Sequence, residues 1–141
     1  MTMIVTFTVF GEPVPKARPR FTRQGRAYTP TKTRDYEKVV ADAARQAMGA
    51  SEALETPVSV FIHVTYEIPK SYTKKRKEAC LNGFERPITR NFGDLDNVTK
   101  SLTDGMNQIV YMDDSQIVGI HATKVFGTES LVQIMVKEEL P

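Results

Sequence analysis

The chain has 141 residues, a formal net charge of +2 and one cysteine, Cys80. This length is enough for one domain with its own core, so we expect residues 1–141 to fold as a single unit. A single cysteine excludes an intramolecular disulfide framework and a cysteine-based zinc site, and it favours a reducing compartment, with the cytoplasm as the expected location. The apolar run 1–10 is interrupted by threonines, lacks a basic start and is too short to span a bilayer, so we expect neither a signal peptide nor a membrane anchor there.

The charged residues are distributed in blocks along the chain. Counting Lys and Arg against Asp and Glu, residues 12–34 carry a net charge of +6, residues 35–69 carry −4, residues 70–90 carry +5 and residues 91–141 carry −5. Basic segments bind phosphates, and carboxylates bind metal ions. The alternation therefore fits a surface that holds phosphates with Lys and Arg while carboxylates supply metal ligands.

The first predicted element is a strand at Ile4–Phe10, because Val5, Phe7 and Val9 alternate with threonines. Residues 11–30, called here the basic arm, contain four prolines and two glycines. This composition predicts an irregular loop or arm without regular structure.

Apolar residues then recur at helical spacing and predict a helix over about residues 33–48. Thr31 or Thr33 could cap its start, and Gly49 is a typical helix stop. A second strand is predicted at Val58–Tyr66, where apolar and polar residues alternate.

Residues 70–90, called here the basic insertion, favour a short helix across Thr73–Leu81. A second amphipathic helix is predicted over residues 95–109, and two strands follow at residues 116–125 and 131–136. The order is strand, helix, strand, helix, strand, strand. It indicates an α+β fold with a mixed sheet of about four strands and two main helices packed on one face.

Acidic residues gather at the start of this second helix. Asp94 and Asp96 open it, and Asp96, Lys100 and Asp104 follow one another at intervals of four residues. That spacing places the three side chains on one face of the helix, with Lys100 one turn from Asp96.

A second acidic pair, Asp113 and Asp114, follows the helix. Mg²⁺ prefers oxygen ligands, so Asp94, Asp96 and one of Asp113 and Asp114 could bind it if the following turn folds back on the helix. Two such ions about 3.5–4 Å apart could activate a water and stabilise a leaving oxygen, while Lys100 would neutralise charge on a phosphate.

The same residues have a purely structural interpretation. Asp at a helix start is usually a cap, and Asp-Asp-Ser is an ordinary turn, so the residues alone leave both interpretations open. An EF-hand is excluded, because Val98 and Thr99 stand where its loop needs an oxygen ligand and a glycine. His63 and His121 lie in strand patterns, and we expect neither in the site.

The basic segments predict contacts with nucleic acid, although a charged run can also be simply a solvated surface. Phe21 and Tyr28 lie among the arginines of the basic arm, where aromatic rings can stack on unpaired bases or wedge a branch point. The candidate DNA-binding residues are Lys16, Arg18, Arg20, Arg23 and Arg26 in the basic arm and Lys74, Lys75 and Arg76 in the basic insertion.

Three motifs in this order resemble the signature of the RusA family of Holliday junction resolvases: Asp94-x-Asp96-Asn97-x-x-Lys100, Asp104-Gly105-Met106-Asn107 and Asp113-Asp114-Ser115-Gln116-Ile117. The beginning of the basic arm, from Gly11 to Arg20, with Tyr28-Thr29-Pro30 after it, also resembles phage and prophage members. Together these segments span nearly the whole chain.

The resemblance implies a homodimeric endonuclease of DNA recombination and repair, in a bacterial host or encoded by a phage. Such an enzyme binds four-way junctions and, with Mg²⁺ or Mn²⁺, nicks two opposing strands symmetrically. It needs no small-molecule cofactor and does not bind membranes. By position, Asp94, Asp96 and Asp114 match the catalytic metal-binding aspartates and Lys100 matches the essential lysine. Asp113 is their neighbour. The implied fold, a mixed sheet flanked by helices, agrees with the predicted order of elements.

Two features depart from the family pattern. The basic insertion is longer than in compact members, and Gly105 stands where many members have alanine. The insertion leaves the substrate preference open, whereas Gly105 replaces no ligand. Two alternatives remain beside a junction resolvase. One is a protein that binds branched DNA without cutting it, and the other is a broader metal-dependent nuclease acting on flaps, forks or RNA.

Overall fold

The computed structural model describes residues 2–141. Its strands are β1 (Ile4–Phe10), β2 (Arg20–Phe21), β3 (Ala27–Tyr28), β4 (Val58–Glu67), β5 (Ile117–Gly127) and β6 (Leu131–Glu138). Its helices are α1 (Thr31–Met48), α2 (Lys74–Leu81) and α3 (Leu95–Met106), with short 3-10 turns η1 (Arg90–Phe92) and η2 (Asp114–Gln116). No helix within residues 2–141 has both the length and the apolar character needed to cross a membrane.

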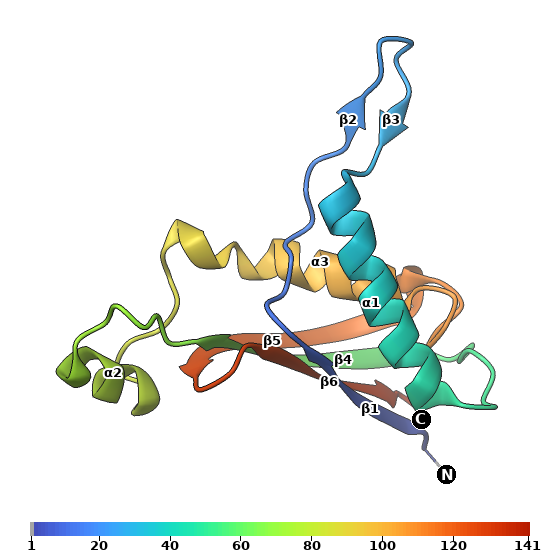
Figure 1. Cartoon of the computed structure of the whole chain (residues 1–141). Helices are drawn as coiled ribbons and strands as arrows, with labels where there is room; N and C mark the ends of the chain where they lie inside the picture. Colours follow the sequence, from blue (N-terminus) through green and yellow to red (C-terminus); the bar gives the residue numbers. More distant parts are fainter. Residues whose placement is uncertain (1) are drawn as a thin grey trace.

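The main sheet has four strands in the order β1-β6-β4-β5. Strand β6 is antiparallel to β1 and β4, whereas β4 and β5 are parallel. Parallel neighbours need a long crossover, which the segment containing α2 and α3 provides. Helices α1 and α3 lie on the same face of the sheet, and α2 lies beyond one end of the body (Figure 1). The predicted α+β class and mixed four-stranded sheet are confirmed.

The core fills the space between the sheet and the two main helices. Strand β4 buries alternate residues, and Val60 and Val64 are fully buried on the face toward the helices. Helix α3 contributes Leu102 and Met106, and α1 contributes Val40, all fully buried. The period of two in the strand and the helical spacing in α1 and α3 place these side chains in one core.

Helices α1 and α3 approach closely at a glycine. A Cβ built on Gly105 would lie 2.7 Å from the Cβ of Val40 and 3.0 Å from the carbonyl oxygen of Glu37. Gly105 therefore allows the two helix backbones to approach, which explains a glycine inside a helix despite its low helix propensity.

This contact gives a prediction for stability. Gly105→Ala should lower the free energy of unfolding by up to about 2 kcal/mol, because overpacking costs about 1–3 kcal/mol and the better helix propensity of alanine returns only about 1 kcal/mol. Urea denaturation measures the change. The double variant Gly105→Ala/Val40→Gly should lose less stability than the sum of the two single variants, since glycine at position 40 has neither the Cβ nor the Cγ1 that the new methyl group would meet. Strict additivity would contradict the close contact.

The prediction that the basic arm lacks regular structure was wrong. Strands β2 and β3 pair in a short hairpin, with Arg20 opposite Tyr28 and Phe21 opposite Ala27. Its turn is closed by the Thr22 N–H, which donates to the Arg26 carbonyl at 2.8 Å, and by Gly25 at a φ of 79°. Glycine tolerates this left-handed conformation, so the residue expected to disrupt regular structure makes the turn.

Helix boundaries also differ in two places. Helix α1 begins at Thr31, and neither Thr31 nor Thr33 caps it, because Pro30 is at the N-cap and the Thr33 hydroxyl accepts the Ala17 N–H instead. Helix α3 ends at Met106 rather than Ile109. The expected stop at Gly49 and the short helix α2, capped by the Thr73 side chain, are confirmed.

Candidate functional site

Two carboxylates stand at the start of helix α3. Asp94 is the N-cap residue with an extended backbone, yet its side chain makes no capping hydrogen bond, and Asp96 lies in the first turn. Both side chains are exposed, and neither has a hydrogen-bond or ion-pair partner within residues 2–141. The cap interpretation therefore does not account for Asp94, and the helix dipole favours negative charge at this position. Asp94 and Asp96 are free to bind a cation.

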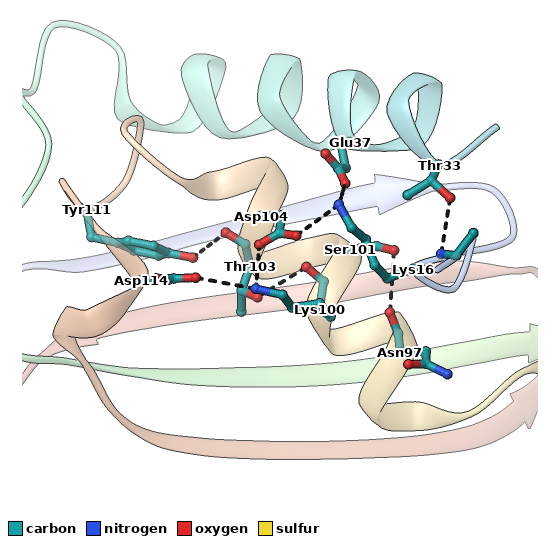
Figure 2. A network of polar contacts seen from close by, with 11 residues as sticks. Lys16, Thr33, Glu37, Asn97, Lys100, Ser101, Thr103, Asp104, Tyr111 and Asp114 are labelled. Atoms are coloured by element: carbon teal, nitrogen blue, oxygen red, sulfur yellow. Dashed lines mark hydrogen bonds and ion pairs between the residues drawn. The ribbon is translucent and has the colours of Figure 1, made fainter. Parts of the chain in front are cut away.

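One turn further along α3, Lys100 connects two other carboxylates. Its Nζ lies 2.9 Å from Asp104 Oδ1 and 3.5 Å from Asp114 Oδ2 (Figure 2). The hydrogen bond to Asp104 is the largest of the effects that raise the pKa of Lys100, and Asp114 adds to it. Lys100 is therefore a cation held in position between helix α3 and turn η2.

Lys16, at the beginning of the basic arm, is bound to the helices. Its Nζ lies 2.5 Å from Glu37 Oε1 on α1 and 3.1 Å from Asp104 Oδ2 on α3 (Figure 2). Its side chain is 20% exposed, and its backbone N–H donates to the Asn97 carbonyl at 2.8 Å. Burial alone would lower the pKa of Lys16, but Glu37 and Asp104 raise it. Lys16 therefore anchors the basic arm to helices α1 and α3.

These contacts form one chain of ion pairs. Asp104 is shared, because one of its oxygens contacts Lys16 and the other contacts Lys100. The chain joins the basic arm, both main helices and turn η2 in the order Glu37, Lys16, Asp104, Lys100 and Asp114. The positions of Lys100 and of the arm are thus determined by a common carboxylate.

Turn η2 presents one of the two adjacent aspartates to the site. Asp113 caps the turn, since its carboxylate accepts the Ser115 N–H at 3.0 Å while Gln116 Oε1 accepts the Asp113 N–H at 2.8 Å. Bonds to Ser115 lower the pKa of Asp113. Gln116 also donates to the carbonyl oxygens of Leu54 and Thr56. Asp113 therefore holds the turn, and Asp114 is the member of the pair that contacts Lys100.

The structure separates the predicted metal ligands into two positions. Within residues 2–141 no group of three Asp, Glu, His or Cys side chains could hold a metal ion, so Asp94, Asp96 and Asp114 are not gathered around one point. Mg²⁺ is typically held by one or two carboxylates, several waters and substrate phosphate oxygens. The unpaired oxygens of Asp94 and Asp96 fit this requirement in donor type and number.

A groove lies beside these residues, between α3 and β5. Its volume is about 490 Å³, and Asp96 and Lys100 line it together with Ile120 and Ala122. Strand β5 is at the edge of the sheet, so the groove is bounded by an exposed strand. It combines a charged side with an apolar side.

Outside the site, the hairpin of the basic arm projects from the body (Figure 1). Phe21 is 70% exposed and Tyr28 is also exposed, beside exposed arginines that have no ion-pair partner within the described chain. These arginines are Arg18, Arg20, Arg23 and Arg26. The predicted DNA-binding residues of the arm thus lie on one projecting element, with Lys16 at its base.

In the basic insertion, the predicted residues divide in two. Lys74 and Lys75 are exposed on α2. Arg76 instead makes a salt bridge of 2.7 Å with Glu85, and its guanidinium carbon lies 3.6 Å from the centre of the Tyr72 ring. His63 and His121, which we expected to lie outside the site, line the face of the sheet opposite α1 and α3.

Two residues of the ion-pair chain were missing from the predicted site. The contact of Asp104 with Lys100 was predictable from the sequence, because residues four apart share one face of a helix. The contact of Glu37 with Lys16 was not predictable, since it joins residues 21 apart in the sequence and depends on how the arm crosses α1.

Comparison with known proteins adds an independent finding. The family model described as Endodeoxyribonuclease RusA matches residues 11–137. The chain is also 36% identical over 139 residues to the uncharacterised protein YqaN of Bacillus subtilis (strain 168), covering 95% of this chain and 96% of that protein. The family match includes the basic arm, the basic insertion, α3 and η2, and it confirms the resemblance that the motifs indicate. The chain belongs to the RusA family of endodeoxyribonucleases.

Proposed function

We propose that this protein is a metal-dependent endonuclease that resolves four-way DNA junctions by paired, symmetric nicks in opposing strands. The observation that carries the proposal is the pair of unpartnered carboxylates, Asp94 and Asp96, one turn before a lysine held between two further aspartates. Membership of an endodeoxyribonuclease family supplies the class of reaction. Work on junction DNA in a bacterial host would occur in the cytoplasm, during recombination and repair.

Asp94 and Asp96 would hold Mg²⁺, or Mn²⁺ as a substitute. Asp114, which does not share one point with them in this structure, would join as a further ligand only if turn η2 moves toward the start of α3 when metal and DNA bind. The bound metal would lower the pKa of a coordinated water and neutralise charge on the phosphate. Lys100 would stabilise negative charge on the phosphate in the transition state. Its contact with Asp114 is long, at 3.5 Å, and exposed ion pairs are weak, so Lys100 can exchange that contact for a phosphate oxygen at low cost.

DNA binding is assigned to the two basic segments. Arg18, Arg20, Arg23 and Arg26 would contact the backbone of the junction arms, with Phe21 against exposed bases at the branch point. Lys74 and Lys75 would add phosphate contacts from α2. In this proposal Lys16 and Arg76 position the two segments, because their cationic groups are already paired.

Symmetric incision requires two equivalent sites, which a twofold homodimer provides. The face of the sheet opposite α1 and α3 has no layer over it in the described chain (Figure 1). It carries Phe61 and Met135 beside His121, and it forms a hollow of about 770 Å³. This face supports the proposed homodimer by offering an extended, partly apolar surface.

Strand-by-strand cleavage of end-labelled junctions tests the proposal. Immobile and branch-migratable junctions, linear duplex and a flap would be incubated with Mg²⁺, with Mn²⁺ and with EDTA. We expect paired, metal-dependent nicks confined to the junctions. Equal cutting of flap or duplex would indicate a broader nuclease instead of a resolvase. Tight binding without cutting in either metal would indicate a protein that only binds branched DNA.

Asp96→Asn is the decisive variant. It removes one negative charge from the metal site, so junction binding should be retained or strengthened while cleavage falls by at least about 10²-fold. Asp35→Asn, the same change at an exposed position of α1, is the matched control and should cut normally. Undiminished cutting by Asp96→Asn would exclude this carboxylate from the reaction.

A further inference from the structure

The last residue of helix α2 and the segment after it expose large apolar side chains in a cationic region. Phe84 is 86% exposed, the largest fraction among the large hydrophobic residues of the described chain, and Leu81 and Ile88 are also exposed. Contiguous exposed apolar patches mark interaction sites, and these three side chains lie within eight residues of one another. Residues 81–88 are called here the Phe84 loop.

The backbone of the Phe84 loop is fixed against helix α2. Gly83 has a φ of 80°, which turns the chain at the helix end. The N–H groups of Phe84 and Glu85 both donate to the Ala79 carbonyl, at 2.9 and 3.2 Å, and the Gly83 N–H donates to the Cys80 carbonyl at 3.2 Å. Phe84 is therefore presented by a closed turn.

Side chains brace the same turn. Arg76 Nε donates to Glu85 Oε1 at 2.8 Å, and the guanidinium of Arg76 lies over the Tyr72 ring. The side chain of Arg86 donates to the Lys124 carbonyl at 2.9 Å on strand β5, and Pro87 is buried. Residues on both sides of Phe84 are thus tied to the body. Because the backbone that carries the Phe84 ring is already ordered, binding a ligand there costs little backbone conformational entropy.

The charges around the loop select the ligand. The basic insertion has a net charge of +5, and Lys74 and Lys75 are exposed on the helix that carries the loop. Glu78 is an exposed carboxylate on α2, and Glu85 is neutralised by Arg76. An apolar protein partner would gain nothing from this positive field. A polyanion with flat, stackable faces matches both the ring and the charge, and that is single-stranded nucleic acid.

We propose that the Phe84 loop is a second DNA contact, in which Phe84 stacks on an unpaired base while Lys74 and Lys75 hold the adjoining phosphates. The proposal deepens the proposed function, on which its choice of DNA as ligand rests, by assigning an unpaired-nucleotide site to the basic insertion. In Figure 1 α2 and the projecting hairpin stand at different places on the body. The two elements can therefore contact different parts of one branched molecule.

The absence of tryptophan from the chain allows a direct test. Phe84→Trp introduces a single tryptophan, whose fluorescence is quenched when a base stacks on it. We expect quenching by a 20-nucleotide oligo(dT), and the same quenching in Phe84→Trp/Asp96→Asn, because the signal requires binding and no cleavage. Phe10→Trp, at an exposed position of β1, is the matched control and should stay unquenched. A failure of cleavage and a failure of this contact are therefore separate results.

Binding of the same oligonucleotide by the otherwise unaltered chain completes the test. Phe84→Ala should weaken it by roughly 5- to 150-fold, the range for loss of one stacked base. Phe84→Leu should weaken it comparably, since leucine is apolar but cannot stack, and circular dichroism checks that both variants fold. Phosphatidylserine vesicles are added in a parallel fluorescence titration of Phe84→Trp to test a membrane as the ligand. Full affinity of Phe84→Leu for the oligonucleotide, no quenching of Phe84→Trp by it, or a fluorescence change with the vesicles alone would overturn the proposal.

Discussion

Replacing Lys100 with alanine should lower the rate of junction cleavage by about 10²–10³-fold, the usual cost of losing one group that stabilises transition-state charge. The fold should survive, because the ion pairs of Lys100 with Asp104 and Asp114 are partly exposed and such pairs contribute about 0–1 kcal/mol. Single-turnover cleavage at saturating enzyme measures the effect on the reaction, and thermal denaturation measures the effect on the fold.

Two further variants sharpen this prediction. Lys100→Arg keeps the charge but replaces a point charge by a planar, longer group, so cleavage should recover only in part. Lys38→Ala removes an exposed lysine from α1, away from the site, and should cut at the normal rate. A Lys100→Ala variant that cuts within about threefold of the unaltered chain, well inside the cost given above, would show that Lys100 only holds α3 and η2 together.

Leu102→Ala should lower the free energy of unfolding by about 2–5 kcal/mol, the range for removing a leucine side chain from a packed core. Leu102 is fully buried, on the helix that carries Lys100 and Asp104, and faces the sheet. At about 2–4 °C per kcal/mol for a chain somewhat larger than this one, the Tm should fall by roughly 5–20 °C.

Leu102→Met is the matched control, since it nearly conserves volume and should cost less than about 1.5 kcal/mol. Below its Tm, Leu102→Ala should still bind junctions, because no DNA-contacting residue has changed. A loss of stability under about 1 kcal/mol would mean that α3 packs loosely on the sheet.

The sequence predicted helices and strands correctly where a hydrophobic pattern continued over several helical turns or several strand residues. The alternation in β4 and the helical spacing in α1 reflect burial on a single face, so each pattern predicts the element and its orientation. Gly49 was equally readable, because a residue with positive φ at a helix end is usually glycine.

The prediction failed where the structure depends on few bonds or on distant contacts. The hairpin of the basic arm pairs only two residues on each strand, too few for an alternation to appear. Helix α3 ends before Ile109 because Gln108 takes a φ of 66° and the following backbone bonds to Leu54 instead. In the site, the motif located Lys100 and Asp114, but the sharing of Asp104 with Lys16 required the folded arm.

The parallel pairing of β4 and β5 has a consequence for how this protein could diversify. Almost every group assigned to chemistry or to the second DNA contact lies in the one segment that connects these neighbouring strands. The entropic cost of closing a flexible loop within such a connection rises by only about 0.6 kcal/mol for each doubling of the loop's length. Evolution can therefore lengthen or shorten the loops of this connection, such as the Phe84 loop, and with them change which DNA structures are held, while α3, the strand register and the core stay as they are.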